Sequence, residues 1–389
     1  GPEEVTYTCP KDGGNLDIIL DYEAIKGQYT PKNFMGLPEA SLWRYHNLLP
    51  VEDPGGYETP LHRAGWTPVY KTTRLAKKLG LEQLWVKDES PNPTASFKDR
   101  ASAIVVARAI QIGAEVTVAA STGNAGAALA GMAAAVGTQA VIFAPKSAPP
   151  AKIAQLIVFG ARVLLVDGTY DQAFDLSIEA TQNFGWYNRN TGYNPFTAEG
   201  KKTAGFEIWE QVIRRLPEDG KPLTVFIPVG DGNIISGVHK GFKDLKALGW
   251  LAHMPRIIGV QSEGSATIAN TFHQGDEDIH AVQADTLADS ISVDLPRDGV
   301  RALRAARETG GTYITVPDSA ILTAIAELGR VGIFAEPAAA TAYAGLVKAM
   351  DESVVASDDP VLVLSTGSGF KDVKAAMQAV SAAPIIEPT

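Results

Sequence analysis

The 389-residue sequence has one cysteine, Cys9, and no apolar run long enough to span a membrane. A single cysteine cannot form an intrachain disulfide, which excludes a disulfide-stapled secreted scaffold and fits a reducing compartment. A membrane helix needs about 18 or more consecutive apolar residues. Because the opening residues also lack the pattern of a signal peptide, we expect a cytoplasmic protein without a membrane partner.

Positive charge is also scarce, with 34 Lys and Arg residues against 44 Asp and Glu residues and a net charge of -10. Nucleic-acid backbones are bound by clustered Lys and Arg, so we expect no nucleic-acid partner. An anionic small molecule would have to be held by a local site. The chain is longer than one hydrophobic core usually supports, which predicts two lobes.

Short apolar runs alternate with helical patterns along most of the chain, without an internal repeat. Glycine closes several of the helical patterns, as is usual at a helix C-terminus. Alternating strands and helices predict an α/β fold with two open, mostly parallel sheets flanked by helices. The expected strands are 115–120, 140–144, 162–166, 223–229, 256–262, 313–317 and 361–366.

Three glycine-rich loops follow expected strands, at the ends where open α/β sheets bind ligands. STGNAG (121–126) offers hydroxyl and amide groups that suit a carboxylate, although the same side chains could cap the next helix. GDGN (230–233) can wrap a phosphate, provided that Asp231 points away or caps the helix. With STGSGFKD (365–372), these loops favour a small phosphorylated ligand.

Lys98 lies in TASFKDR, between a polar loop and an apolar helical run. Lysines at such boundaries are usually solvated. The segments SFKDR, STGNAG, PVGDGN and STGSGFKD, in this order and spacing, resemble the fold type II pyridoxal-phosphate enzymes, and more narrowly the threonine synthases. The resemblance runs from about Tyr7 and includes SLWRYHNLLPV, GWTPVYKTTRLAKKLG, NPFTAEGKKTAGFEIWE and VGIFAEPAAA.

The resemblance implies a tryptophan synthase β-like fold that usually pairs as a homodimer. Its parts would be a degenerate ribbon-like segment (1–30), a large cofactor-binding lobe (31–95 and 206–389) and a smaller lobe (96–205) with the lysine and asparagine loop. Only Cys9 remains of the cysteine-rich ribbon common in this family, so we expect no zinc site.

The resemblance also assigns roles to individual residues. Lys98 would form the Schiff base with pyridoxal 5'-phosphate and act as the catalytic residue. Asn124 would bond the ring hydroxyl, and Thr366 would face the ring nitrogen as a neutral partner. The cofactor phosphate would lie on the backbone of Gly230, Asp231, Gly232, Asn233 and Ile234. The amino-acid substrate would be bound by Ser121, Thr122, Ala125 and Thr197.

Threonine synthases convert O-phosphohomoserine and water into threonine and phosphate, without a metal. One position departs from the family: Thr197 stands where an arginine is expected to grip the substrate phosphate. Two alternatives therefore stay open. One is a related elimination or replacement enzyme for another hydroxy- or phospho-amino acid, of the threonine or serine dehydratase or cysteate synthase type; the other is a non-catalytic sensor. Four nearby cations could replace the missing charge: Lys201, Lys202, Arg297 and Arg301.

Overall fold

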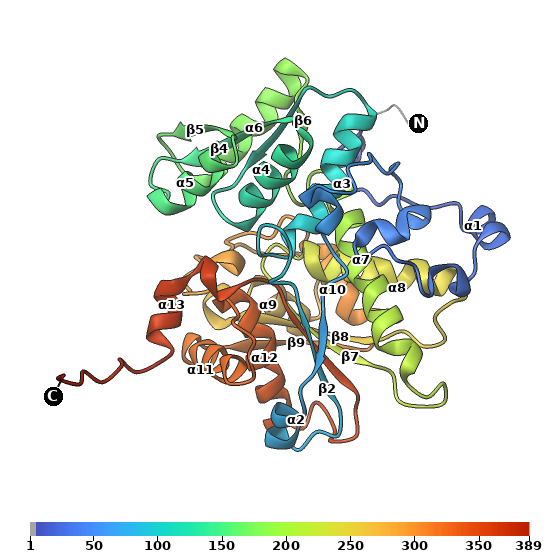
Figure 1. Cartoon of the computed structure of the whole chain (residues 1–389), viewed down its shortest axis with the longest axis vertical. Coiled ribbons are helices and arrows are strands. Elements are labelled where there is room, and N and C mark those ends of the chain that lie inside the picture. Colours follow the sequence, from blue (N-terminus) through green and yellow to red (C-terminus); the bar gives the residue numbers. More distant parts are fainter. Residues whose placement is uncertain (1–4, 389) are drawn as a thin grey trace.

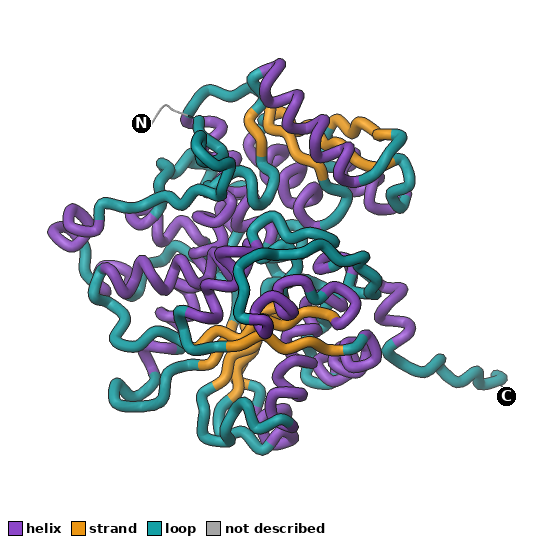
Figure 2. The backbone as a smooth tube through the Cα atoms, turned by 180° about the vertical axis from the view of Figure 1, so that it is seen from behind, coloured by secondary structure: helices purple, strands orange, loops and turns teal. Residues whose placement is uncertain are grey.

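The computed structural model of the chain describes residues 5–388, and their strands form two separate sheets, one in each half of the molecule (Figures 1 and 2). The smaller sheet is parallel, in the order β5-β4-β3-β6, and the larger has the order β1-β2-β10-β7-β8-β9, with only β1 antiparallel. The predicted pair of open, mostly parallel sheets is thus confirmed. The strands are β1 (Val69–Lys71), β2 (Leu84–Asp88), β3 (Val116–Ala120), β4 (Gln139–Pro145), β5 (Arg162–Val166), β6 (Tyr187–Asn188), β7 (Thr224–Pro228), β8 (Arg256–Ser262), β9 (Thr312–Val316) and β10 (Val361–Ser365).

Helices flank both sheets and connect consecutive parallel strands. Glycines with positive φ follow α4 and α6, at Gly137 (72°) and Gly185 (69°), where a left-handed residue ends each helix. The helices are α1 (Tyr22–Gln28), α2 (Thr73–Leu79), α3 (Lys98–Gln111), α4 (Asn124–Val136), α5 (Pro150–Val158), α6 (Tyr170–Phe184), α7 (Phe196–Gln211), α8 (Asn233–Ala247), α9 (Thr267–Gln274), α10 (Gly299–Arg307), α11 (Asp318–Gly329), α12 (Pro337–Asp351) and α13 (Val373–Gln378). Short 3-10 helices cover Pro31–Phe34, Leu42–Leu48, Pro60–Arg63, Ile213–Arg215, Glu263–Ser265, Asp289–Ile291 and Gly369–Lys371.

All seven strands expected from the sequence are present, but β1, β2 and β6 were not predicted. β2 was missed because Lys87 and Asp88 interrupt its apolar pattern. The Lys87 side chain is nevertheless fully buried, since its Nζ lies 2.8 Å from Oε2 of Glu207. A charge can occupy a central strand when a buried partner compensates it.

Glycines bring α7 and α8 unusually close together near the middle of the molecule (Figure 1). A Cβ atom on Gly241 would lie 2.3 Å from the carbonyl oxygen of Lys202, and one on Gly237 would lie 2.6 Å from the Cβ of Lys201. The close crossing places Lys201 of α7 beside the start of α8, which follows the GDGN loop.

The N-terminal part of the described chain packs against both halves of the molecule, since Phe34, Tyr45 and Leu48 belong to the core that contains residues of β7 and β10. Tyr7 stacks on Tyr193 and accepts a 2.8 Å hydrogen bond from the backbone N–H of Asn188, beside the smaller sheet. Buried residues between Leu42 and Ala64 share a core with α3 and α4. The division at residues 95 and 96 therefore stays a prediction, although segments on both sides of it share one core. The first four residues of the predicted segment 1–30 lie outside the described part.

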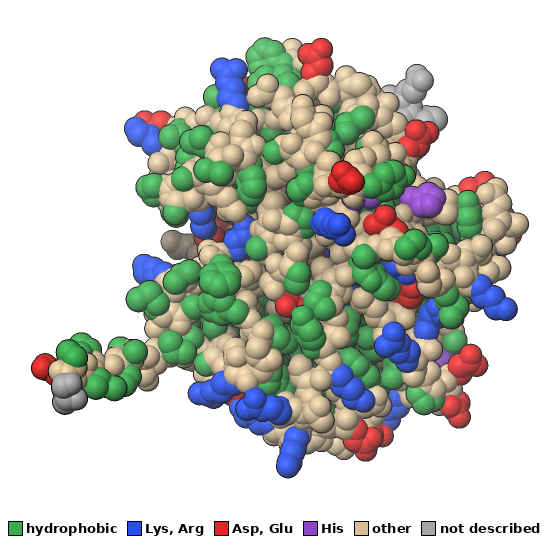
Figure 3. Space-filling model, in the orientation of Figure 1, with side chains coloured by type: hydrophobic (Ala, Val, Ile, Leu, Met, Phe, Trp, Pro, Cys, Tyr) green, Lys and Arg blue, Asp and Glu red, His purple; other side chains and the backbone are tan. Residues whose placement is uncertain are grey.

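Figure 3 shows one face of the molecule, where acidic and basic side chains are interspersed among apolar ones. The described residues after α13, up to residue 388, project away from the body of the protein (Figures 1 and 3). Between residues 5 and 388, no helix combines the length and the apolar character needed to cross a membrane.

Candidate active site

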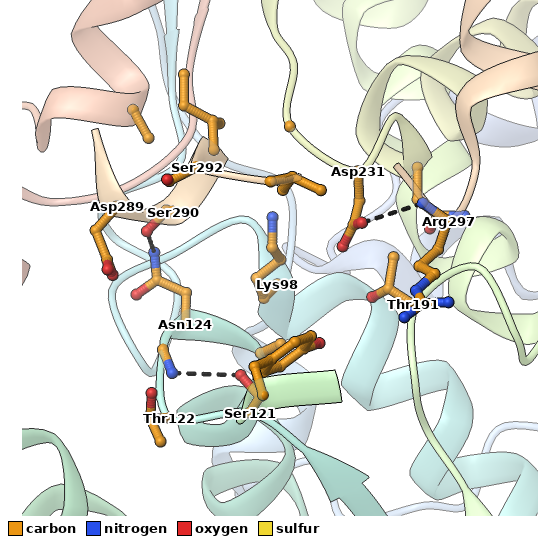
Figure 4. A pocket seen from close by; sticks show the side chains of 18 of the residues that line it. Lys98, Ser121, Thr122, Asn124, Thr191, Asp231, Asp289, Ser290, Ser292 and Arg297 are labelled. Carbon is orange, nitrogen blue, oxygen red and sulfur yellow. Dashed lines mark hydrogen bonds between the residues drawn. The ribbon is translucent and has the colours of Figure 1, made fainter. Parts of the chain in front are cut away.

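A cavity of about 690 Å³ lies between the two sheets, at the carboxyl ends of their parallel strands. Loops after β3, β7 and β10 line it together with the residues that follow β6. This is the edge at which open α/β sheets bind ligands. In Figure 4, Lys98 lies between a group formed by Asn124 and Ser290 and a group formed by Asp231 and Arg297.

Lys98 is the first residue of α3, and its side chain reaches into the cavity. Its neighbour Phe97 is fully buried and fixes the start of the helix by donating its backbone N–H to the carbonyl oxygen of Thr366 (2.8 Å). Burial lowers the pKa of the Lys98 amine, and the positive charge of Arg189 lowers it further, against the opposing charges of Glu336 and Asp231. With a lowered pKa, a larger fraction of the amine is neutral at physiological pH and available to act as a nucleophile or to accept a proton.

The STGNAG loop forms a second wall of the cavity. The helix α4 begins at Asn124, and no side chain caps it, so backbone N–H groups at its start are available to a ligand. Ser121, Thr122 and Ala125 all line the cavity here, and their role in binding the substrate stays a prediction. Gly126 allows the tight turn, because a Cβ atom there would lie 2.3 Å from the carbonyl oxygen of Ser121.

Asn124 is held by a buried carboxylate that the sequence did not assign to the site. Its Nδ2 donates to both oxygens of Glu336 (2.9 and 3.0 Å) and to Oγ of Ser290 (3.2 Å). Burial raises the pKa of Glu336, while Asn124 and Lys98 oppose that shift. The signal in the sequence was an acidic residue directly before Pro337, at the start of a helix.

The GDGN loop presents the N-terminus of α8 to the cavity, and Gly230, Asp231, Gly232, Asn233 and Ile234 all line it. Glycine is required twice. Gly232 has a φ of 89°, and a Cβ on Gly230 would lie 2.8 Å from the Cα of Ile291. No side chain caps α8, so its first N–H groups can bind an anion.

Of the two placements expected for Asp231, the helix cap is excluded because no side chain caps α8, and its orientation away from a bound phosphate stays a prediction. Its Oδ1 accepts a 3.2 Å hydrogen bond from the backbone N–H of Arg297, and its side chain lies on the cavity wall (Figure 4). Burial raises the pKa of this carboxyl group, and the charges of Lys98 and Lys201 oppose the shift.

Thr366 lines the cavity at the end of β10, whereas Thr197 does not line the cavity found in the described chain. Thr197 is fully buried in α7, where its hydroxyl donates to the carbonyl oxygen of Asn194 (2.7 Å). Its role as a substrate-binding residue therefore finds no support in its position. The role of Thr366 opposite a ring nitrogen stays a prediction.

Two of the four cations proposed from the sequence line the cavity, namely Lys201 and Arg297. Lys201 Nζ donates to Oδ1 of Asn233 (2.5 Å), at the first residue of α8. Arg297 Nη2 lies 2.7 Å from Oδ1 of Asp171. The other two cations, Lys202 and Arg301, are outside the lining of the cavity.

Arg189 is a cavity residue that the sequence analysis missed. It follows β6 directly and is only 1% exposed. Its Nε donates to Oγ of Ser102 (3.1 Å) and its Nη1 to Oγ1 of Thr191 (2.9 Å), while Nη2 has no partner among the described residues. A basic residue at the carboxyl end of a short strand was the available signal, but β6 itself was not predicted.

Comparisons with known proteins agree with this arrangement. A family model described as "Pyridoxal-phosphate dependent enzyme" matches residues 61–367. Threonine synthase from Methanocaldococcus jannaschii is 37% identical over 97% of this chain and 91% of its own length. Threonine synthase from Methanosarcina acetivorans is 38% identical over 95% of this chain and 89% of its own length. Among solved structures, threonine deaminase isoform 2 from Solanum lycopersicum is similar with a TM-score of 0.71 and 20% identity, covering 97% of this chain and 99% of that one.

Proposed function

Because the chain belongs to the family of pyridoxal-phosphate dependent enzymes, we propose that it is a threonine synthase, which converts O-phosphohomoserine and water into threonine and phosphate. The observation that carries this proposal is the similarity to two threonine synthases at 37% and 38% identity over nearly the whole chain. The likeness to threonine deaminase, at 20% identity, supports the fold alone.

The residues of the cavity fit the cofactor. The N-terminus of α8 and the glycines of its loop would hold the cofactor phosphate, since a Cβ on Gly230 or Gly232 would collide with neighbouring chain within 3 Å. Lys98 supplies an amine for covalent attachment. Asn124 and Thr366 would bond the ring hydroxyl and the ring nitrogen. These individual roles are part of the proposal.

Bound at this site, the cofactor supplies an electron sink for the negative charge that develops on the substrate carbons. The chain's own residues position the substrate and move protons. Lys98, with its lowered pKa, would take protons from Cα and Cβ of the substrate before phosphate leaves Cγ. A proton is then returned to Cγ to form the methyl group, and water adds across Cα and Cβ with its hydroxyl group at Cβ and a proton at Cα. Ser121, Thr122 and the N–H groups at the start of α4 would hold the substrate carboxylate.

The side chain of Thr366, opposite the ring nitrogen, would contribute to the choice of reaction because its hydroxyl group is uncharged. A hydroxyl group does not hold a proton on the ring nitrogen as a carboxylate would, so the electron sink is weaker. A weaker sink favours elimination and replacement at Cβ or Cγ over transamination, in agreement with the proposed reaction.

A cytoplasmic location and a homodimer belong to the same proposal. The homodimer is proposed because fold type II enzymes usually pair as dimers. Light scattering of the purified protein in the presence of cofactor would measure the oligomer. A monomer at micromolar concentration would reject the homodimer without affecting the proposed reaction.

The test of the function is a substrate panel on the cofactor-loaded enzyme, with phosphate, threonine and ketoacids measured separately. O-phosphohomoserine should yield threonine and phosphate in equal amounts, with a kcat/KM of roughly 10⁴ M⁻¹s⁻¹ or more. Ketoacid formed from threonine or serine, without threonine from O-phosphohomoserine, would favour the dehydratase alternative. Lys98→Ala is the matched control and should form none of these products.

A further inference from the structure

The proposed substrate carries a phosphate, and the position at which the family resemblance places its arginine is occupied by Thr197. Thr197 is fully buried and outside the cavity lining, and its short neutral side chain lacks the charge and the paired donors of an arginine. A phosphate entering a closed cavity loses its hydration, and the loss is costly unless cations and hydrogen-bond donors replace the water. Another cation of this chain must therefore provide the charge.

Three of the four cations proposed from the sequence already have carboxylate partners. Lys202 Nζ lies 2.9 Å from Oδ2 of Asp244, and Arg301 pairs with Asp298 and Asp17. Arg297 pairs with Asp171 and stacks on Phe174, at 4.7 Å from its ring centroid. A cation that is already paired gains less from an added anion.

Lys201, the fourth of these cations, lies beside the start of α8. Its Nζ lies at the side chain of Asn233, where α8 begins and where the cofactor phosphate would be bound. Burial lowers the pKa of Lys201 strongly, and the charges of Lys98 and Arg189 add to the effect. An anion at the start of α8 would relieve this repulsion, so we place Lys201 with the phosphate of the cofactor.

Arg189 remains, and its geometry is that of a prepared anion site. Ser102 and Thr191 hold the Nε and Nη1 ends of the guanidinium, which leaves Nη2 as a buried donor without a partner in the described chain. Arg189 forms no salt bridge with a carboxylate among residues 5–388, although the charges of Asp99 and Asp231 act on it from a distance. Burial lowers the pKa of Arg189 to about 10, so it stays charged at neutral pH. An unpaired buried charge is costly unless a ligand completes it.

We infer that Arg189, oriented by Ser102 and Thr191, binds the terminal phosphate of the substrate in place of the arginine missing at position 197. This inference rests on the proposed function and makes Arg189 a specificity-determining residue. Guanidinium groups suit this task because their fixed fork can donate two hydrogen bonds to one phosphate. Arg189 follows β6 and lines the cavity, whereas the position that the family resemblance indicates lies in α7, outside the cavity lining.

The test measures binding rather than turnover. Wild-type enzyme, Arg189→Gln and Arg189→Lys, each loaded with cofactor, are titrated with L-2-amino-5-phosphonopentanoate and with L-norvaline, and the cofactor absorbance reports binding. The phosphonate cannot leave, and L-norvaline has the same carbon chain without the anion. For Arg189→Gln we expect a loss of phosphonate affinity of roughly 10- to 100-fold, with L-norvaline affinity within about 3-fold of wild type. The phosphonate affinity of Arg189→Lys should lie between that of wild type and that of Arg189→Gln.

Three outcomes would overturn the inference: unchanged phosphonate affinity, an equal loss for both ligands, or loss of the cofactor itself, which would assign Arg189 to the cofactor phosphate. If Arg189→Gln does not fold, the same comparison is made with Arg189→Lys, which keeps the charge. Arg304→Gln, an exposed site with the same change of charge, controls for net charge.

The parallel assay of O-phosphohomoserine separates this inference from the proposed function. Threonine formation by the wild type, with phosphonate affinity unchanged in Arg189→Gln, would reject Arg189 alone. A selective loss of phosphonate affinity without threonine formation would support the anion site and reject the threonine synthase reaction.

Discussion

Lys98 and Arg189 show how position changes the chemistry of a basic side chain. Both residue types are usually exposed, and both lie here on the wall of one cavity. Burial lowers the pKa of each, but the consequence differs because their usual pKa values differ. The Lys98 amine gains a neutral fraction that can attack and move protons, whereas the Arg189 guanidinium stays charged and can hold an anion.

The first prediction at this scale concerns Lys98. Lys98→Ala should abolish covalent attachment of the cofactor and reduce threonine formation by several orders of magnitude, with the fold intact. Borohydride treatment of cofactor-loaded wild type, followed by peptide mapping, should label the peptide that contains Lys98. A label on any other lysine would reject the assignment.

His239 gives a second prediction, on the pH dependence of stability. Burial lowers its pKa to about 4, although Oε2 of Glu308 lies 3.5 Å from its Nε2. Burial outweighs this contact because Glu308 is 45% exposed, so its charge is screened by water.

Because the unfolded chain binds the proton near pH 6.5, the stability from neutral His239 is complete above that pH. It is lost progressively as the pH falls toward about 4, by up to about 3 kcal/mol. The difference in melting temperature between pH 7 and pH 4.5 should therefore be smaller for His239→Gln than for wild type. Equal pH dependence in the two proteins would contradict the prediction.

At the scale of the element, the crossing of α7 and α8 supports the site, because α8 begins at the cavity and α7 contributes Lys201 to its wall. Gly241→Ala should destabilise the protein by roughly 1–3 kcal/mol, since the new Cβ would press on the carbonyl oxygen of Lys202 and force the helices apart. Denaturant unfolding measures the change.

Gly27→Ala is the matched control for this substitution. Gly27 lies inside α1, where a Cβ would meet nothing within 4 Å, so alanine should leave stability unchanged or raise it by up to about 1 kcal/mol. Similar losses in both variants would show that the close crossing is not the cause.

At the scale of the whole molecule, the two sheets differ in how deeply they are buried. β7 and β10 are buried along their whole length in the larger sheet, whereas β5 is a half-exposed edge of the smaller one. Native-state hydrogen exchange should therefore be slowest in β7 and β10 and faster in the exposed edge strands, β5 of the smaller sheet and β1 of the larger one. Equal protection in the two sheets would indicate that the molecule opens only as one unit.

The sequence predicted those parts of the fold that local pattern specifies. The parallel strands have apolar runs, and the cofactor loops have glycines where positive φ or close backbone approach demands them, as at Gly232. The sequence did not predict elements whose residues are stabilised by a distant charged partner rather than by a local apolar pattern. β2 contains Lys87, which is tolerated only because Glu207, 120 positions later in the chain, compensates its charge.

The amino-acid sequence by itself determined the fold class, the cofactor family and the position of Lys98 at the start of a helix, because these follow from periodicity and from motifs of adjacent residues. Only the tertiary structure decided which cations are available to a ligand. Lys202 forms a salt bridge with Asp244 and Arg301 with Asp17, whereas Arg189 forms no salt bridge among the described residues and its Nη2 has no partner there. These partners are remote in the chain, and no local pattern records which charges will be brought together when the sheets and helices pack.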